Sequence, residues 1–530
     1  MSPHSREKVQ IPQGVQVREG DFDVGESEVV PEPETFDRFG RIVRGLAADP
    51  SDRAALEFMV KFDELDFRRL VMALIFGENL PSNRQAKRIE RFVRVQLDKG
   101  ERLQKKQFTH PATPMWPRPN LVVPAEQSVF QQRHESMAII GDGPVGIIMA
   151  NLRGQLGYEY VATTLYSPKG LLGGIWQQDR VADGGHNTFS SIDVLGARLE
   201  AREPRPGSAI RHFLHLAQSL YVDHSLNVGR VTNVEIDPHT GQYIVTSVGP
   251  YGEEVQRFDS VLCATGNGIP KNLNAADAPM ITNALDVRAP LKRWQEQIPR
   301  ERWHEFHNTH PMVVGLGNSA IEMIQQFVQM REAGVNVRPR ILTHYSRDAL
   351  LHPNKMVRSE YGIIEGPIQR TRANLTKLAL DIPRIVRPYD EALRQGWVVP
   401  DVTEWNVTEQ KGSGKERRMT IEVRTRDGEV RRVGDVPVVY ALVGYQNKPE
   451  LMDSLNVRVV DDSGRIEYDP VLHQAHPARG TSRRMYVAGA MASRPGDRNQ
   501  EVIPGALQAI AEIAFIEAVR GRIAVQQRAV

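Results

Sequence analysis

Two stretches of the chain share one pattern of apolar and polar positions: a short apolar run, a cluster of glycines, and an apolar segment long enough for a helix. In residues 138–150 the glycines are Gly141, Gly143 and Gly146, with Pro144 among them. A short apolar run bounded by turn residues predicts a buried strand. The pattern therefore predicts a strand that turns tightly into a helix.

The spacing of these glycines is typical of loops that hold a pyrophosphate. Gly141 permits the tight turn, Gly143 lets the backbone approach the phosphates, and Gly146 lets the helix pack closely on the strand. The positive end of the helix then faces the negative charge. We expect Gly141, Gly143, Pro144 and Gly146 to bind a dinucleotide.

The same pattern returns in residues 311–330. Its loop contains Gly315, Gly317, Asn318 and Ser319, and alanine replaces the third glycine, a substitution that the motif tolerates. An internal duplication is stronger evidence than either loop alone. A chain with two nucleotide-binding units can hold two dinucleotides that face each other.

Each glycine loop is followed by short strands separated by turns, which predicts a β-meander in each unit. Their expected positions are 231–236, 243–248 and 254–258 in the first unit, and near 407, 419–424 and 430–433 in the second. A buried strand closes each unit, at 260–266 with Gly266 at its end, and at 438–444. Near the C-terminus, a strand ending at Gly489 precedes a helix at 504–519, whose N-terminus is aimed at an anionic ligand.

The front of the chain has a different pattern. Residues 1–30 are polar and are expected to be disordered or loosely attached. Apolar positions in 34–107 recur at spacings of three and four, which predicts helices, and prolines between 111 and 124 form a linker. We interpret this section as a helical cap on the main body. A lid, an oligomer arm and a partner-binding region are the alternatives.

Together these patterns predict an α/β fold with two Rossmann-like dinucleotide-binding units, each with a β-meander, and an N-terminal helical extension. The expected boundaries are 1–130 for the extension and its linker, 131–290 for the first unit, 291–440 for the second, and 441–530 for a C-terminal return to the first.

Composition restricts the class of protein. Apolar residues make up 40% and charged residues 25% of the 530 residues, and the net charge of +2 gives no reason to expect a nucleic-acid partner. We expect no membrane span and no secretory signal, because no apolar run is long enough for either. The single cysteine, Cys263, fits a reducing compartment such as the cytoplasm, and it excludes chemistry that needs a cysteine pair.

The second strand of a dinucleotide unit usually ends in an acid that binds a ribose hydroxyl. In the first unit this strand, expected at 160–166, is followed by Ser167, so either the serine makes a weaker hydrogen bond or the adenosine end is held differently. In the second unit the strand expected at 340–345 is followed by Arg347, which favours the 2′-phosphate of NADPH. A solvated surface charge is the alternative for Arg347.

Two further segments indicate ligand contacts. Gly173 and Gly174 precede Trp176, which suits a loop that runs close beneath a ligand while the ring packs on it; a turn with a core tryptophan is the alternative. Asn187 is a candidate for a catalytic polar group over the ligand, or else a hydrogen-bonding loop residue. Three histidines between 304 and 310 have helical spacing, but no cysteine or paired acid accompanies them, so we expect no metal site.

From about residue 137 to the C-terminus, the chain resembles the two-dinucleotide-binding flavoprotein monooxygenases. The loop at 141–146 looks like their FAD loop, and the loop at 315–320 looks like their NADPH loop. Residues 173–176 are similar to the Gly-Gly-x-Trp loop of flavin-containing and Baeyer–Villiger enzymes. Residues 442–445 with Pro449 resemble the Ala-Thr-Gly-Tyr…Pro stretch of amine N-hydroxylases.

Three features depart from that family. The acid after the second strand of the first unit is missing, and alanine instead of aspartate follows Gly489. The Phe-x-Gly-x-x-x-His sequence of flavin-containing and Baeyer–Villiger enzymes is absent, and the corresponding linker carries Asn283 and Ala284. This last absence favours the amine N-hydroxylating subfamily.

The resemblance implies an FAD- and NADPH-dependent monooxygenase that N-hydroxylates a small amine or amino acid through a flavin hydroperoxide, with O₂ as the second substrate. The protein would exclude water, keep the amine neutral and position it. The alternatives are an NAD(P)H-dependent flavoprotein dehydrogenase or reductase without oxygen insertion, and a non-catalytic nucleotide-binding regulator. Whether the protein is a homo-oligomer is left open.

Overall fold

The computed structural model describes residues 33–61, 93, 95, 134–170, 172–174, 220–266, 269–270, 281–283, 298, 300–316, 318–347, 350, 356–359, 362–365, 383–412, 418–443, 445–446, 449–459, 464–481, 483–492 and 503–528. The sites Trp176, Asn187 and Gly317 lie outside the described residues, as does most of the front section beyond residue 61. Among the described helices, none combines the length and the apolar character that crossing a membrane requires.

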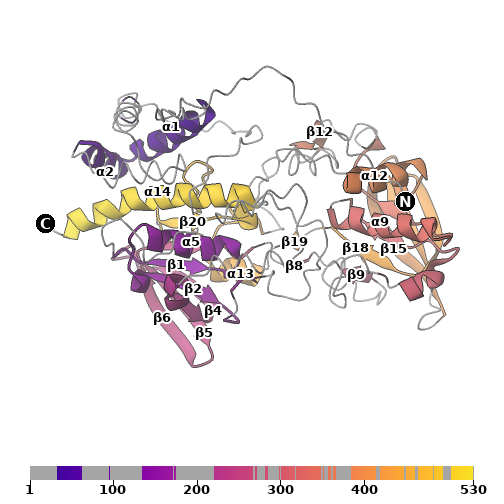
Figure 1. Ribbon diagram of the computed structural model, residues 1–530, viewed down its shortest axis with the longest axis horizontal. Coiled ribbons are helices and arrows are strands. Elements are labelled where there is room, and N and C mark those ends of the chain that lie inside the picture. Colours follow the sequence, from indigo (N-terminus) through magenta and orange to yellow (C-terminus); the bar gives the residue numbers. More distant parts are fainter. Residues whose placement is uncertain are drawn as a thin grey trace, which may run out of the picture.

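A five-stranded parallel sheet forms the centre of the first unit (Figure 1), in the order β20-β7-β1-β2-β3. Its strands are β1 (Met137–Ile140), β2 (Thr163–Ser167), β3 (Leu226–Val228), β7 (Ser260–Cys263) and β20 (Met485–Val487). β1 and β7 are buried along their whole length, which explains why their sequences are continuous runs instead of alternating patterns. Helix α5 (Pro144–Gln155) follows β1 directly and contacts β1 and β2.

The second strand of this unit is shorter than expected. The strand predicted at 160–166 begins as the 3₁₀ turn η2 (Tyr160–Ala162), and β2 starts only at Thr163. Thr163 pairs with Met137, the first residue of β1, so residues 160–162 have no strand of the sheet beside them. A short helix, α7 (Leu220–His224), leads into β3.

An antiparallel meander follows in the first unit. It consists of β4 (Arg230–Ile236), β5 (Tyr243–Gly249) and β6 (Gly252–Phe258). Tyr243, Val245 and Ser247 are buried and the residues between them are not, which is the alternation of a half-buried strand. The Asp237 carboxylate accepts the His239 backbone N–H at 2.9 Å and so fixes the β4–β5 turn.

A second five-stranded parallel sheet has the order β14-β11-β10-β18-β9. Its strands are β9 (Ile281–Asn283), β10 (Met312–Val314), β11 (Arg340–Leu342), β14 (Val398–Val399) and β18 (Val439–Ala441). Helix α9 (Asn318–Glu332) follows β10 and packs against α12 (Pro383–Arg394). The antiparallel meander of this unit is β15 (Val402–Lys411), β16 (Arg418–Thr425) and β17 (Val430–Val436).

The two units are built alike, as the duplicated pattern predicts. In both, the strand before the glycine loop lies at the centre of the sheet, flanked by the next strand of the unit and by the strand that follows the meander. One boundary was wrong: Ile281–Asn283, expected in the first unit, pairs with β18 and belongs to the second sheet. The return of the chain after residue 441 is present, because β20 forms the edge of the first sheet.

Smaller elements join and flank the units. β8 (Ile269–Pro270) pairs with β19 (Tyr445–Gln446), and β12 (Met356–Ser359) pairs with β13 (Gly362–Glu365). The remaining helices are α13 (Pro449–Ser454) and the 3₁₀ turns η6 (Arg300–Phe306) and η8 (Ala490–Ala492).

A long C-terminal helix, α14 (Ile503–Arg528), lies between the first unit and the N-terminal helices (Figure 1). Those helices are α1 (Pro33–Ala47) and α2 (Pro50–Lys61), and they are separated where the Asp49 carboxylate accepts the Ser51 N–H at 3.0 Å. Every side chain of α14 from Ala509 to Gly521 is buried, because α5 covers one face and α2 another. The described part of the extension therefore caps the main body.

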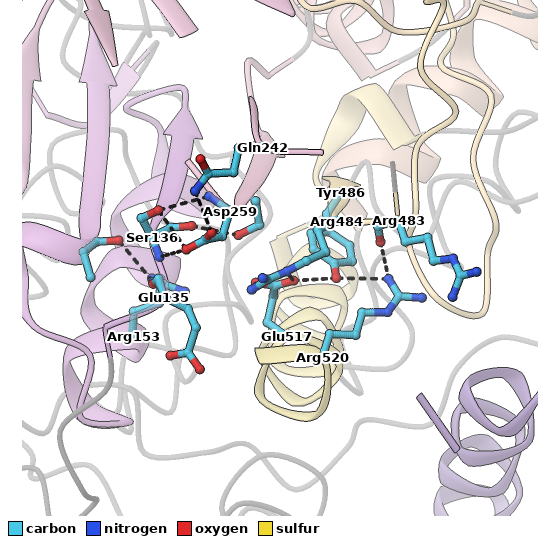
Figure 2. Close-up of polar contacts among 12 residues, drawn as sticks. Glu135, Ser136, Arg153, Gln242, Asp259, Arg483, Arg484, Tyr486, Glu517 and Arg520 are labelled. Carbon is cyan, nitrogen blue, oxygen red and sulfur yellow. Dashed lines mark hydrogen bonds and ion pairs between the residues drawn. The ribbon is translucent and has the colours of Figure 1, made fainter. Parts of the chain in front are cut away.

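A buried polar network ties α14 to β20 (Figure 2). The Glu517 carboxylate accepts two hydrogen bonds from Arg484, at 3.1 and 2.7 Å, and one from the Tyr486 hydroxyl at 2.6 Å. Burial alone raises the pKa of Glu517, but the Arg484 guanidinium outweighs it and the pKa is lowered. Arg520, one helical turn further on, donates to the Asp52 carboxylate of α2 at 3.1 Å.

Candidate functional site

The turn between β1 and α5 accepts only glycine at two positions. Gly141 has a φ of +126°, and a Cβ there would lie 2.3 Å from the Ala264 carbonyl oxygen, at the end of β7. A Cβ on Gly146 would lie 1.9 Å from the Gly141 carbonyl oxygen. The first glycine therefore lets the strand turn beside β7, and the third lets α5 approach that turn, as the loop pattern predicts.

Gly143 differs from these two glycines. Its φ of −75° is open to any residue, and a Cβ there would have no atom within 4 Å. It is the N-cap of α5, no side chain caps the helix, and Pro144 takes the first helical position. Among the described residues the space beside this N-cap is therefore open, and a helix N-terminus without a side-chain cap is an arrangement that can bind an anion.

The loop that contains Gly173 and Gly174 packs against the turn between β1 and α5. The Gly173 N–H donates to the Asp142 carbonyl at 2.6 Å, and a Cβ on Gly174 would lie 3.0 Å from the Gly143 Cα. Both glycines have positive φ, of +116° and +56°. Two motifs that are separate in the sequence are therefore in contact at the N-terminus of α5.

Two further glycines end the neighbouring strands on the other side of β1. Gly266, after β7, has a φ of +79° and open space where its Cβ would stand. Gly489, after β20, has a φ of +85°, and a Cβ there would lie 3.2 Å from the Val145 side chain in the first turn of α5. The carboxyl ends of β20, β7 and β1 thus share one edge that is lined with glycine turns, where open α/β sheets bind ligands.

The second unit repeats the first turn closely. Gly315 has a φ of +104°, and a Cβ there would lie 2.4 Å from the Leu442 carbonyl oxygen, after β18. This close approach is the counterpart of that between Gly141 and Ala264. Asn318 begins α9, so the loop again leads directly into a helix. Only the backbone is described at Asn318 and Ser319.

Arg347 lies beyond β11, the counterpart of β2. Its side chain is exposed, and its backbone N–H donates to the Asp401 carboxylate at 3.2 Å. Asp401 itself has a φ of +55°. The backbone of Arg347 is therefore held at the carboxyl edge of the second sheet while the guanidinium stays available to solvent.

The described residues show no candidate metal site. No group of three or more histidine, cysteine or acidic residues stands ready to hold a metal ion among them. His304 and His307 are exposed on and after η6. Cys263 is fully buried in β7, and burial raises the pKa of its thiol to about 12.

One residue of the site was missed from the sequence. Asp142 stands between the first two glycines, and its Oδ2 accepts the Ser167 hydroxyl at 2.6 Å. Burial raises the pKa of Asp142, while the Ser167 hydrogen bond and the Lys169 charge oppose the shift. The sequence did contain a signal for Asp142: an acid lies inside the glycine loop, and no acid follows the second strand of this unit.

No protein-family model matches the chain, and no curated protein matches it. Solved structures that resemble it include N-hydroxylating flavoprotein monooxygenases. The ornithine N-hydroxylase of Kutzneria sp. 744, with reduced FAD, NADP⁺ and L-ornithine, is 14% identical, with a TM-score of 0.45 over 73% of this chain and 99% of its own. The ornithine hydroxylase of Pseudomonas aeruginosa is 12% identical, with a TM-score of 0.44 over 74% of this chain and 99% of its own.

The FAD-bound cadaverine monooxygenase of Erwinia amylovora is 11% identical, with a TM-score of 0.46 over 73% of this chain and 94% of its own.

Proposed function

We propose that the first unit binds FAD, that the second binds NADPH, and that the protein is a flavoprotein monooxygenase acting on the nitrogen of a small amine or amino acid. The observation that carries the proposal is the repeated turn. Gly141 lies against the Ala264 carbonyl and Gly315 against the Leu442 carbonyl, each directly before a helix. Two equivalent turns in one chain fit two dinucleotides.

The residues of the first unit fit FAD. The uncapped N-terminus of α5, with open space at Gly143, would hold the pyrophosphate. The turn at Gly266 leaves open space at the edge of the sheet, and the turn at Gly489 lies against the Val145 side chain in the first turn of α5. Bound FAD would accept a hydride and activate O₂. Within this proposal, Trp176 would pack on the cofactor and Asn187 would present a polar group to it.

The second unit would position NADPH. Gly315, Gly317, Asn318 and Ser319 form the loop for its pyrophosphate, and the exposed Arg347 pairs with the 2′-phosphate. A guanidinium can donate two parallel hydrogen bonds to a phosphate. NADH has no 2′-phosphate and cannot accept them.

Two features support amine oxidation over the related chemistries. The stretch at 442–445 with Pro449 resembles the Ala-Thr-Gly-Tyr…Pro stretch of amine N-hydroxylases. Disulfide chemistry is excluded because the single thiol, Cys263, is buried. The same thiol fits a protein that acts in the cytoplasm. The protein would hold the amine neutral and away from water, so that its lone pair remains available.

The test begins with the visible spectrum of the purified full-length protein titrated with FAD. NADPH oxidation and O₂ uptake are then measured with ornithine, lysine, cadaverine and other small amines, and the products are analysed for hydroxylamines. We expect a bound-flavin spectrum, and O₂ uptake that rises with one class of amine and yields a hydroxylamine.

Two results would replace the proposal with an alternative. NADPH oxidation by the flavoprotein without oxygenated product from any amine would indicate a dehydrogenase or reductase. Failure to bind both FAD and NADPH would indicate that the glycine turns hold neither cofactor.

A further inference from the structure

The end of β2 lacks the group that usually holds the ribose of a dinucleotide. In these folds an acid at this place accepts hydrogen bonds from the ribose hydroxyls. Here β2 ends at Ser167, and Pro168, Lys169 and Gly170 follow. None of the four can supply a carboxylate.

A carboxylate nevertheless reaches this place from the neighbouring loop. The Asp142 Oδ2 accepts the Ser167 hydroxyl at 2.6 Å, so the carboxylate lies at the carboxyl end of β2. Because Ile140 pairs with Tyr166, the loop that begins at Gly141 leaves β1 beside Ser167, the last residue of β2. The Asp142 side chain crosses that short gap.

The backbone around Asp142 is fixed on both sides. The Gly141 N–H donates to the Tyr166 carbonyl at 3.3 Å, and the Asp142 carbonyl accepts the Gly173 N–H at 2.6 Å. Ser167 then fixes the rotamer of the side chain. A carboxylate offers about four acceptor positions; the Ser167 hydroxyl takes one of them, and the backbone N–H of Asp142 itself also donates to the carboxylate. The group is therefore oriented and keeps capacity for further donors.

The stability of the fold does not explain the presence of an acid at Asp142. Burial makes its ionised form less favourable in the folded protein than in the unfolded chain, and its pKa is raised. A folded-state pKa above the unfolded value means that the ionised group lowers stability at neutral pH. A carboxylate that does not stabilise the fold and lies at the ligand-binding edge of the sheet is a candidate binding group.

We propose that the Asp142 carboxylate, oriented by Ser167, accepts the hydroxyl hydrogen bonds of the adenosine ribose of FAD in place of the missing acid after β2. This inference depends on the proposed binding of FAD by the first unit. FMN, which has the flavin and one phosphate but no adenosine, would not use the contact. Asp142 therefore contributes to the preference for FAD over FMN.

The test compares the affinities of full-length wild type and Asp142→Asn for FAD and for FMN, from flavin fluorescence after the bound flavin is removed. We expect FAD binding to weaken roughly 10- to 150-fold, the range for a lost hydrogen bond to a charged group. FMN binding should stay within about twofold, and the thermal midpoint of the flavin-free variant should equal or exceed that of wild type. Asp237→Asn, a carboxylate in the β4–β5 turn, is the matched control and should leave both affinities unchanged.

A second variant, Ser167→Ala, removes the orienting hydroxyl and should weaken FAD binding by a smaller factor, about 3- to 10-fold. Equal FAD affinities of wild type and Asp142→Asn would overturn the inference. So would equal losses for FAD and FMN, or a lower thermal midpoint with unchanged affinity, since both indicate that Asp142 only braces the loop. Failure of the wild type to bind FAD would instead overturn the proposed function.

Discussion

Replacing Gly143 and Gly146 separately by alanine would separate the binding of the pyrophosphate from the folding of the loop. A Cβ on Gly146 lies 1.9 Å from the Gly141 carbonyl oxygen, and ordinary contact begins near 3.4 Å, so α5 must move by about 1.5 Å (3.4 minus 1.9 Å). Such overpacking destabilises by about 1–3 kcal/mol or more, and the better helix propensity of alanine returns at most about 1 kcal/mol. Gly146→Ala should therefore lower the free energy of unfolding.

Gly143→Ala should leave folding almost unchanged. Its Cβ meets no atom within 4 Å, and its φ of −75° is ordinary for alanine. Alanine restricts the unfolded chain, which stabilises by about 0.4–1 kcal/mol, but is a poorer N-cap than glycine by a similar amount. The methyl group would, however, stand where the phosphates approach. Losing one charged hydrogen bond of about 1.5–3 kcal/mol weakens FAD binding roughly 10- to 150-fold.

The assays are urea unfolding of the flavin-free variants and titration with FAD. Two results would refute the reasoning. If Gly143→Ala bound FAD as tightly as wild type, the phosphates would not approach the N-terminus of α5. If Gly146→Ala were as stable as wild type, α5 would not be held against the turn as described.

Three further predictions concern other parts of the chain. Arg347→Ala should weaken NADPH binding about tenfold or more and leave NADH binding unchanged; equal effects on both, measured from initial rates, would remove the arginine from coenzyme choice. Cys263 should resist a thiol reagent at pH 8 in the native protein, because its pKa is about 12, and should react fully in denaturant; fast native labelling would contradict its burial. Glu517→Gln should destabilise the protein by about 3–5 kcal/mol, because it removes the carboxylate that is hydrogen-bonded to the buried Arg484. Because the pKa of Glu517 is lowered in the folded protein, the ionised Glu517 stabilises the fold above pH 4.5, and this stabilisation is lost as the pH falls. Glu517→Gln should therefore lose less stability in acid than wild type does. Parallel profiles of stability against pH would contradict this.

The sequence predicted the turns and helix starts of the site well, because each of them lies within a few consecutive residues. The turns at Gly141 and Gly315 and the helices after them follow from the spacing of glycines and apolar runs. The packing of the Gly173 loop on Asp142 did not follow, because it joins residues that only the fold brings together. The same holds for Ser167, whose partner stands 25 positions earlier.

Pairing between short strands was the other limit. β9 has three residues, and its partner Val439–Ala441 is far along the chain, so no periodicity marked it as part of the second sheet. The burial of the polar side chains of α14 could not be predicted from the sequence either. Glu517 and Arg520 look like the solvated face of a surface helix, yet they are buried because Arg484, Tyr486 and Asp52 pair with them.

The late position of β20 has a consequence for biosynthesis. All five strands of the second sheet lie between residues 281 and 441, so that unit is complete in the emerging chain before β20 is made. The first sheet must wait, with β7 as an open hydrogen-bonding edge, until β20 and α14 leave the ribosome. A chain truncated before residue 485 should keep a folded second unit while its first unit associates with chaperones or aggregates.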